Sequence, residues 1–329
     1  MAVMRSRWIA AICAVLLGAS VAASSALGQA AEEEHVSRVS LAGSAAPLLE
    51  FRESEIKFSL AHLMSTLRDH QHEGWVLAAY PDPKTNRPLI GAGFSLDVPA
   101  RELPQYDPLN VNSFVEPSSA ELWTAAGLAP AKLDEILARF DRDVSRWSKQ
   151  SYRRKVRHET LEPELTEEQG VRLLRISAIQ AVHNAKAYCR YFDSLTGSQQ
   201  MALSQLVFQM GVNLEEFEHF LSALNGDTVY RDLSRTDDGT PSESERWRLV
   251  QTTLVESEWA RRYTTRAQTV IAMFDPVYSR DPVGAERRVE AMLPVPVVVR
   301  RRRSSARTLR AGAEGGHSGK PKAHKRQLA

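Results

Sequence analysis

Apolar residues recur every three or four positions along most of the chain, which is the spacing that places side chains on one face of a helix. The segments with this spacing are 55–72, 120–126, 130–149 and 166–190, and four further helical stretches extend to about Met273. Thr166 and Gln169 form a T-x-x-Q capping pattern, which predicts a helix start. Segment 198–210 is apolar on almost every side, which is typical of a helix buried in a bundle. The chain is therefore predicted to be mostly helical.

One part of the pattern departs from helical spacing. Trp75–Tyr80 is a short apolar run, and a second run ends at Gly91-Ala92-Gly93. The intervening residues include three prolines and Asn86, which are typical of a turn. We therefore expect a β-hairpin or small sheet here, and an α+β fold for the chain. Residues 99–118 are expected to form a loop, as are residues 235–245.

The beginning of the chain has the pattern of a targeting segment. Residues 1–30 combine a short basic start, an apolar stretch and a small-residue end, which predicts a cleaved secretory signal peptide. The apolar stretch is shorter than the roughly 20 residues that a spanning helix needs, although an uncleaved anchor is the alternative. Residues 31–54 are rich in Ala, Ser, Gly and Glu and are expected to be a flexible leader. The folded domain is expected over 55–290, in a periplasmic or secreted protein.

Charge is distributed unevenly along the chain. Residues 300–329 carry ten basic residues and one acidic residue, whereas residues 31–299 carry 30 basic and 39 acidic residues. Segment 291–329 is therefore expected to be a basic, disordered tail. Its charge suits contact with anionic cell-surface polymers, and a tail that only aids solubility is the alternative. It has no aromatic residue to stack on a base, so specific nucleic-acid binding is not expected.

The chain has two cysteines, and only one would remain after export. Cys13 would leave with the signal peptide, so no internal disulfide can form. We expect Cys189 to be a packed apolar side chain rather than a nucleophile. A histidine cluster adjoins Glu73, but no Cys or carboxylate spacing completes a set of metal ligands; its members are His62, His70 and His72. We therefore expect neither a metal nor a cofactor.

Two carboxylates are the candidates for catalysis. Glu73 lies where the first helix stops, and Asp82 lies in the turn of the hairpin. Glycoside hydrolysis uses such a pair, one protonated acid for the leaving oxygen and one carboxylate to activate water or stabilise charge on the sugar. Both residue types are also common in solvated turns, and the spacing alone leaves the two interpretations open.

Several short motifs occur in the order found in one known family. They are Glu73-Gly74, Tyr80-Pro81-Asp82, Ile90-Gly91-Ala92-Gly93, Val207-Phe208-Gln209-Met210-Gly211, and Ser257-x-Trp259 followed by Arg266-Ala267. On these motifs the chain resembles the phage-type lysozymes, the muramidases of glycoside hydrolase family 24. The resemblance covers about 59–94 and 166–275 and leaves 97–163 as an insertion.

The resemblance implies a lysozyme-like fold with a small sheet lobe and a helical lobe. It also implies a monomer that hydrolyses, with inversion, the β-1,4 bond between N-acetylmuramic acid and N-acetylglucosamine in peptidoglycan. Carried over by residue, Glu73 is the general acid, and Asp82 orients water or stabilises charge. Gln209 is a hydrogen-bonding residue of the cleft wall, and Arg266 is a cation beside Glu73. The remaining motif residues are expected to pack in the core; they are Phe208, Met210 and Trp259.

Leu89 departs from the family pattern. The family usually has Thr directly before Ile-Gly-x-Gly, where its hydroxyl helps to hold the attacking water, and positioning of this kind supplies much of a hydrolase's rate. Thr85 and Ser95 are nearby hydroxyls, but neither is in register. Three functions therefore stay open: a muramidase with a different water arrangement, a catalytically weak peptidoglycan-binding protein of the same fold, and a helical interaction protein whose insertion binds a partner and covers the cleft.

Overall fold

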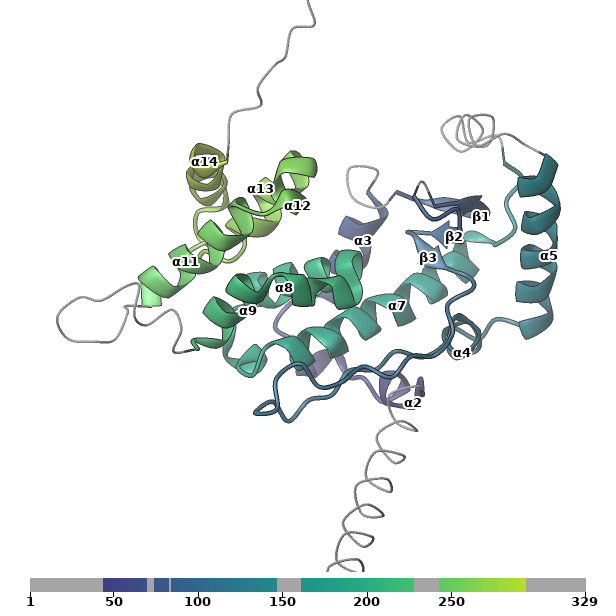
Figure 1. Ribbon diagram of the computed structural model, residues 1–329, viewed down its shortest axis with the longest axis horizontal. Coiled ribbons are helices and arrows are strands. Elements are labelled where there is room, and N and C mark those ends of the chain that lie inside the picture. The colour runs from purple at the N-terminus through teal and green to yellow at the C-terminus, as the bar shows by residue number, and fades with distance from the viewer. Residues whose placement is uncertain (1–43, 70–73, 83, 147–160, 228–242, 294–329) are drawn as a thin grey trace, which may run out of the picture. The chain divides into compact units, whose positions relative to one another are not determined.

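The computed structural model describes residues 44–69, 74–82, 84–146, 161–227 and 243–293 (Figure 1). All of them belong to the first of two units, Met1–Pro294. The predicted signal peptide, residues 235–242 of the loop predicted over 235–245, and residues 294–329 of the predicted tail lie outside the described residues. The prediction of a loop is wrong for residues 243–245, which begin α11 (Glu243–Val255). Within the described ranges, no helix is both long enough and apolar enough to cross a membrane.

The predicted hairpin is confirmed as part of a three-stranded antiparallel sheet. Its strands are β1 (Val76–Pro81), β2 (Pro88–Gly91) and β3 (Phe94–Ser95), in the order β1-β2-β3. Leu89 is in register with Tyr80 on one side and with Ser95 on the other. In the turn, Asn86 has a positive φ of 60°, which Asn tolerates better than most residues. The chain is α+β and mostly helical, as predicted.

Two helices form the centre of the described structure. They are α7 (Glu167–Tyr188) and α8 (Gly197–Met210), which pack against each other. Each begins with a reciprocal capping box, and the first is the predicted pair of Thr166 and Gln169. Every residue of α8 from Gln199 to Val207 is buried, which confirms the prediction of a helix enclosed on all sides.

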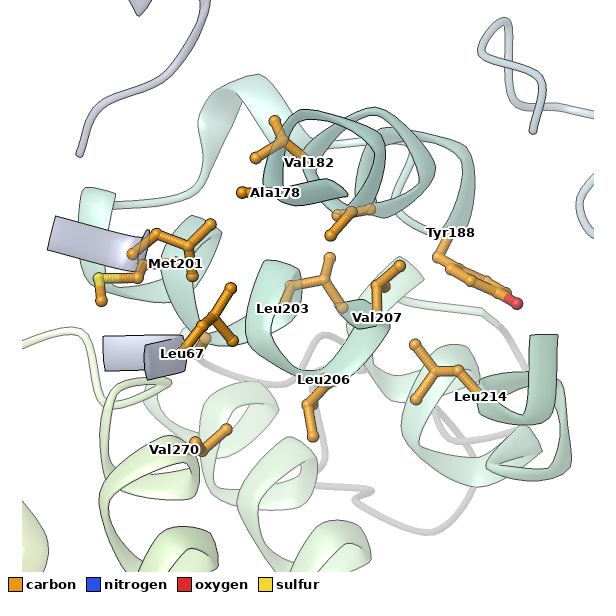
Figure 2. Close-up of a cluster of buried hydrophobic side chains, with 14 of the residues drawn as sticks. Leu67, Ala178, Val182, Tyr188, Met201, Leu203, Leu206, Val207, Leu214 and Val270 are labelled. Carbon is orange, nitrogen blue, oxygen red and sulfur yellow. The ribbon is translucent and has the colours of Figure 1, made fainter. Parts of the chain in front are cut away.

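Side chains from several elements fill the space around α8. Figure 2 shows Leu203 and Val207 of α8 near Val182 of α7, with Leu206 directed toward Val270. The other helices of this region are α3 (Leu60–Arg68), α9 (Glu218–Asn225), α11 (Glu243–Val255), α12 (Glu258–Arg262), α13 (Thr264–Ala272) and α14 (Pro282–Met292). Both α3 and α13 contact α8. The core therefore joins segments from both halves of the chain.

Cys189 lies directly after α7 and is fully buried. Burial raises the pKa of its thiol to about 11, so the thiolate is scarce at neutral pH. The prediction of a packed, unreactive side chain is confirmed.

The segment 97–163 is part of the same core rather than a separate appendage. It contains α4 (Ser119–Ala125) and α5 (Pro130–Arg146), and residues 99–118 form the predicted loop. Phe114 and Val115 of the loop and Trp123 of α4 are buried in the common hydrophobic core.

The residues that follow this segment are bonded to the edge of the sheet. The backbone N–H groups of Glu164 and Leu165 donate to the carbonyl oxygen of Leu77, over 2.7 and 3.0 Å. The Glu164 carboxylate accepts from the backbone N–H of Ala79 at 2.7 Å and forms a bidentate ion pair with Arg139 of α5. Strand β1 is thus held on this side by residues that follow α5.

The start of the folded region differs from the prediction. The sequence predicts a flexible leader over 31–54, but the part described, from Ser44, includes α2 (Ala46–Leu49) and a short 3₁₀ helix (Glu53–Glu55). Leu48 is buried, α2 packs on α7, and Glu55 pairs with Lys186 of α7 at 2.7 Å. Arg175 of α7 also pairs with Glu53 at 3.7 Å, so buried Leu48 and two ion pairs dock this short segment on α7.

The helix predicted over 55–72 is shorter than expected at both ends: it ends at Arg68, and Asp69, which follows, has an extended backbone. The helix begins only at Leu60, because the side chain of Ser59 accepts a hydrogen bond from the backbone N–H of His62 and so caps the first turn.

We expect replacement of Thr166 by Ala to lower the free energy of unfolding by about 1 kcal/mol, because the first turn of α7 loses its capping hydroxyl. Chemical denaturation of the purified protein measures this change. Thr166→Ser keeps the hydroxyl and should remain close to the wild type. Equal losses in both variants would show that the cap does not stabilise the fold.

Candidate functional site

A cavity lies where the sheet, the loop 97–119 and the two central helices meet. We call it the sheet-side cavity; its volume is about 320 Å³. The sheet contributes Gly93–Ser95, and the end of α8 contributes Val207–Gly211. The cavity is therefore lined by the last residue of the Ile-Gly-Ala-Gly motif, Gly93, and by the Val-Phe-Gln-Met-Gly motif, which are far apart in the sequence.

A second hollow lies beside the first, at the end of α8. This turn-side cavity has a volume of about 410 Å³ and is lined by Lys84 of the hairpin turn and by residues of α12, among them Trp259 and Arg262. Gln209 and Met210 line both cavities. The two hollows therefore share part of their wall at the end of α8, and we call the pair the groove.

Gln209 lines both cavities, and its role toward a sugar stays a prediction. Its side-chain oxygen Oε1 accepts a hydrogen bond from the indole N–H of Trp259 at 2.8 Å. Trp259 is only 6% exposed, which confirms it as core packing. Because Oε1 is bound to Trp259, the amide N–H₂ of Gln209 is the group oriented for another acceptor. Phe208 and Met210 pack against the core, as expected, but they are only half-buried and also line the cavities.

Asp82 closes the turn of the hairpin. Its Oδ1 accepts hydrogen bonds from the backbone N–H groups of Lys84 and Thr85, at 2.8 and 2.6 Å, and from the Thr85 hydroxyl at 2.9 Å. All three bonds go to one oxygen, so Oδ2 carries none of them. Asp82 lies two residues from Lys84, which lines the turn-side cavity.

The turn also sets the charge of Asp82. Partial burial acts to raise the pKa of this carboxyl, but the hydrogen bonds from Thr85 and Lys84 and the positive charge of Lys84 outweigh it. The pKa therefore lies below its ordinary value, and Asp82 is ionised at neutral pH. An ionised carboxylate suits a group that orients water or stabilises positive charge, whereas a proton donor requires the opposite shift.

The other proposed carboxylate lies outside the described residues. Glu73 belongs to the segment 70–73, and so do His70 and His72 of the histidine cluster. The residues on either side are described: the backbone N–H of Gly74 donates to the carbonyl oxygen of Asp69 at 3.1 Å. This bond links the residue that follows α3 to a residue just before β1. The role of Glu73 stays a prediction.

Arg266 lies in the first turn of α13 and is only 4% exposed. Arginine side chains are rarely this buried unless the guanidinium is paired with another group. The burial of Arg266 therefore indicates a partner within this part of the fold. Its predicted position beside Glu73 stays a prediction, because Glu73 is outside the described residues.

Three residues bear on the missing water-positioning hydroxyl. Leu89 lies in the middle strand β2 and is half-buried, so no hydroxyl stands at the position where the family has Thr. The hydroxyl of Thr85 is bonded to Asp82. Ser95 is the cross-strand partner of Leu89 and lines the sheet-side cavity. Directly opposed residues of antiparallel strands share one face, so Ser95 supplies a hydroxyl close to the position of Leu89.

Among the charged residues of the cavities that sequence reasoning missed is Glu116. It lies in the loop 97–119, where it has no periodic pattern around it, and it lines the sheet-side cavity. The only signal in the sequence is its position between the apolar pair Phe114-Val115 and Pro117, which places an acid directly beside buried residues.

Among the described residues, no group of three or more His, Cys, Asp or Glu side chains is arranged to hold a metal ion. Comparison of the chain with models of protein families, with curated proteins and with solved structures gives no match. The function must therefore be inferred from the residues of the groove.

We expect Thr85→Val to raise the pKa of Asp82 toward its ordinary value, because the variant removes one of the three donors to Oδ1. NMR titration of the aspartate carboxyl carbons measures this change, and Thr85→Ser is the matched control that keeps the hydroxyl. A carboxyl whose pKa is lower in the folded than in the unfolded protein stabilises the fold at any pH above its unfolded-state pKa. This stabilisation is lost as the pH falls through the folded-state pKa.

The stability of Thr85→Val should therefore fall less steeply with acid than that of the wild type in this range. The difference should stay below about 1 kcal/mol because the turn is largely exposed. An unchanged pKa in Thr85→Val would mean that the two backbone donors alone fix the charge of Asp82.

Proposed function

We propose that the protein is a peptidoglycan hydrolase with a lysozyme-like fold, an N-acetylmuramidase that cleaves the β-1,4 bond between N-acetylmuramic acid and N-acetylglucosamine. The main support is the sheet-side cavity: Gly93, the last residue of the Ile-Gly-Ala-Gly motif, and the whole Val-Phe-Gln-Met-Gly run at the end of α8 line it together. Amide, hydroxyl and aromatic groups occur together there, as saccharide recognition requires. We further propose that the protein is exported and acts on the cell wall.

In this proposal Glu73 donates its proton to the glycosidic oxygen as the bond from that oxygen to the anomeric carbon breaks. Asp82, ionised by its turn, accepts a proton from a water molecule whose oxygen bonds the anomeric carbon from the opposite face. The products are two shorter glycan strands, and the configuration is inverted. Such a reaction requires about 6.5–9.5 Å between the carboxyl groups, so that the water fits between them.

Leu89 supports a second candidate function, that of a peptidoglycan-binding protein with weak or no turnover. An apolar side chain in β2 cannot hold the attacking water, although it leaves the lining of the groove intact. Loss of a positioning group lowers the rate of the chemical step more than the affinity for substrate. The two candidates therefore predict similar binding and different turnover.

Release of reducing sugar ends from purified peptidoglycan tests the proposed activity. We expect the exported protein to release them, and Glu73→Gln to lower the rate by a factor of about 100 or more, which is typical for removal of a general acid. Glu135→Gln is the control, because Glu135 is an exposed residue of α5 and the charge change is the same. Thermal unfolding of each variant verifies that it is folded.

Leu89→Thr separates the two candidate functions. A wild type without turnover that binds peptidoglycan, together with turnover in Leu89→Thr, would identify the binding protein. A wild type that neither binds nor cleaves peptidoglycan would refute both candidates. Turnover that Glu73→Gln leaves intact would refute the assignment of the general acid.

A further inference from the structure

The sheet-side cavity contains a charged pair that belongs to the segment 97–163. Glu116 Oε1 accepts a hydrogen bond from the side-chain N–H₂ of Asn184 at 3.0 Å, and Oε2 lies 3.5 Å from Nη2 of Arg101. The Glu116 side chain is 13% exposed, and Arg101 is about half exposed. Both residues line the cavity. They are its one acidic and one basic residue among the described residues that form its wall.

The carboxylate of Glu116 is held in a fixed place. Asn184 of α7 is 3% exposed, accepts from the backbone N–H of Val115 at 2.9 Å and donates to the Val115 carbonyl oxygen at 3.2 Å. Gln180, one turn earlier on α7, donates to the same oxygen at 3.1 Å. The backbone N–H of Arg101 donates to the carbonyl oxygen of Glu116 at 3.0 Å. A group fixed in this way can select a ligand because it loses little freedom on binding.

Packing of the loop against the core does not by itself require a carboxylate at position 116. Burial raises the pKa of its carboxyl, while Arg101 and the hydrogen bond from Asn184 oppose that rise. A buried carboxylate costs stability unless it is paired, and an amide or an apolar residue would fill the same space without that cost. Carboxylates that are kept in clefts against this cost are candidates for a functional role.

We propose that Glu116 is a specificity-determining residue, which accepts hydrogen bonds from the hydroxyl or acetamido N–H groups of a neutral amino sugar bound in the sheet-side cavity. A carboxylate has about four acceptor positions, and Asn184 and Arg101 do not use them all. Because Arg101 already balances the charge, the ligand needs no positive group. Phe94 and Phe208 line the same cavity and offer apolar surface to the sugar ring.

The identity of the sugar rests on the proposed function, but its binding does not require turnover. The cavity volume of about 320 Å³ is at the lower end of the range for ligand sites, which suits one sugar unit of a longer strand. Glu116 would thus select which unit lies here, whereas the bond is broken elsewhere in the groove.

Steady-state kinetics on peptidoglycan tests the role of Glu116. We expect Glu116→Gln to raise KM about tenfold and to leave kcat within about a factor of two, because the lost contact is made equally in the bound substrate and the transition state. Glu135→Gln on α5 is the matched control and should change neither value. Glu116→Asp keeps the charge but shortens the side chain, and it should also raise KM. An unchanged KM in both Glu116 variants would overturn the proposal.

A binding experiment separates this proposal from the proposed function. Calorimetry with the soluble tetramer of N-acetylglucosamine should show about tenfold weaker binding to Glu116→Gln than to the wild type, even when no reducing ends are released. Absence of turnover on peptidoglycan, together with this loss of affinity for the tetramer, would refute the hydrolase and support the sugar site. Equal affinity of the wild type and Glu116→Gln would refute the sugar site, whether or not the protein is a hydrolase.

A partly deacetylated tetramer carries ammonium groups, so it tests whether Arg101 already balances the charge of Glu116. Glu116→Gln should lose affinity for it and for the acetylated tetramer to the same degree. A selective loss of affinity for the deacetylated form would mean that Glu116 binds an ammonium group, and would overturn the assignment of a neutral ligand.

Discussion

The enclosure of α8 is the constraint on which the rest of the structure depends. A helix that is apolar on almost every side must be covered on almost every side, and α3, α7 and α13 contribute to this cover (Figure 2). These helices come from both halves of the chain, so burial of α8 fixes the two halves against each other. The last turn of α8 reaches the sheet, where it exposes Gln209 and Met210 to the groove. The groove is therefore a direct consequence of where the buried helix ends.

Two carboxylates near this groove have opposite electrostatic surroundings. Asp82 collects three hydrogen bonds on one oxygen in an exposed turn, so its charged form is favoured. Glu116 lies against the core, and burial disfavours its charged form in spite of Arg101. Two residues with the same functional group are thus suited to different tasks, ionic stabilisation for Asp82 and short-range hydrogen bonding for Glu116.

The sequence predicts those parts of the fold that depend on local rules. The capping box of Thr166 and Gln169, the hairpin around Asn86 and the enclosed helix at 198–210 follow from turn chemistry and periodicity, and all are confirmed. Glu116 and the docking of Leu48 could not be predicted, because both depend on contacts with α7 more than 60 residues away. The same limit applies to Ser95, whose place opposite Leu89 follows from strand register rather than from any motif. Patterns over a few residues predict helices and strands, whereas the residues that line the groove are brought together by contacts between distant parts of the chain.

The bonds between Glu164 and β1 have a consequence for association between chains. An edge strand with open N–H and C=O groups is a template on which a strand of another molecule can pair. Here the carbonyl oxygen of Leu77 and the N–H of Ala79 are already occupied by residues 164 and 165 of the same chain. These residues thus shield the sheet as well as anchor it, so a shortened chain without them would be prone to aggregate through β1.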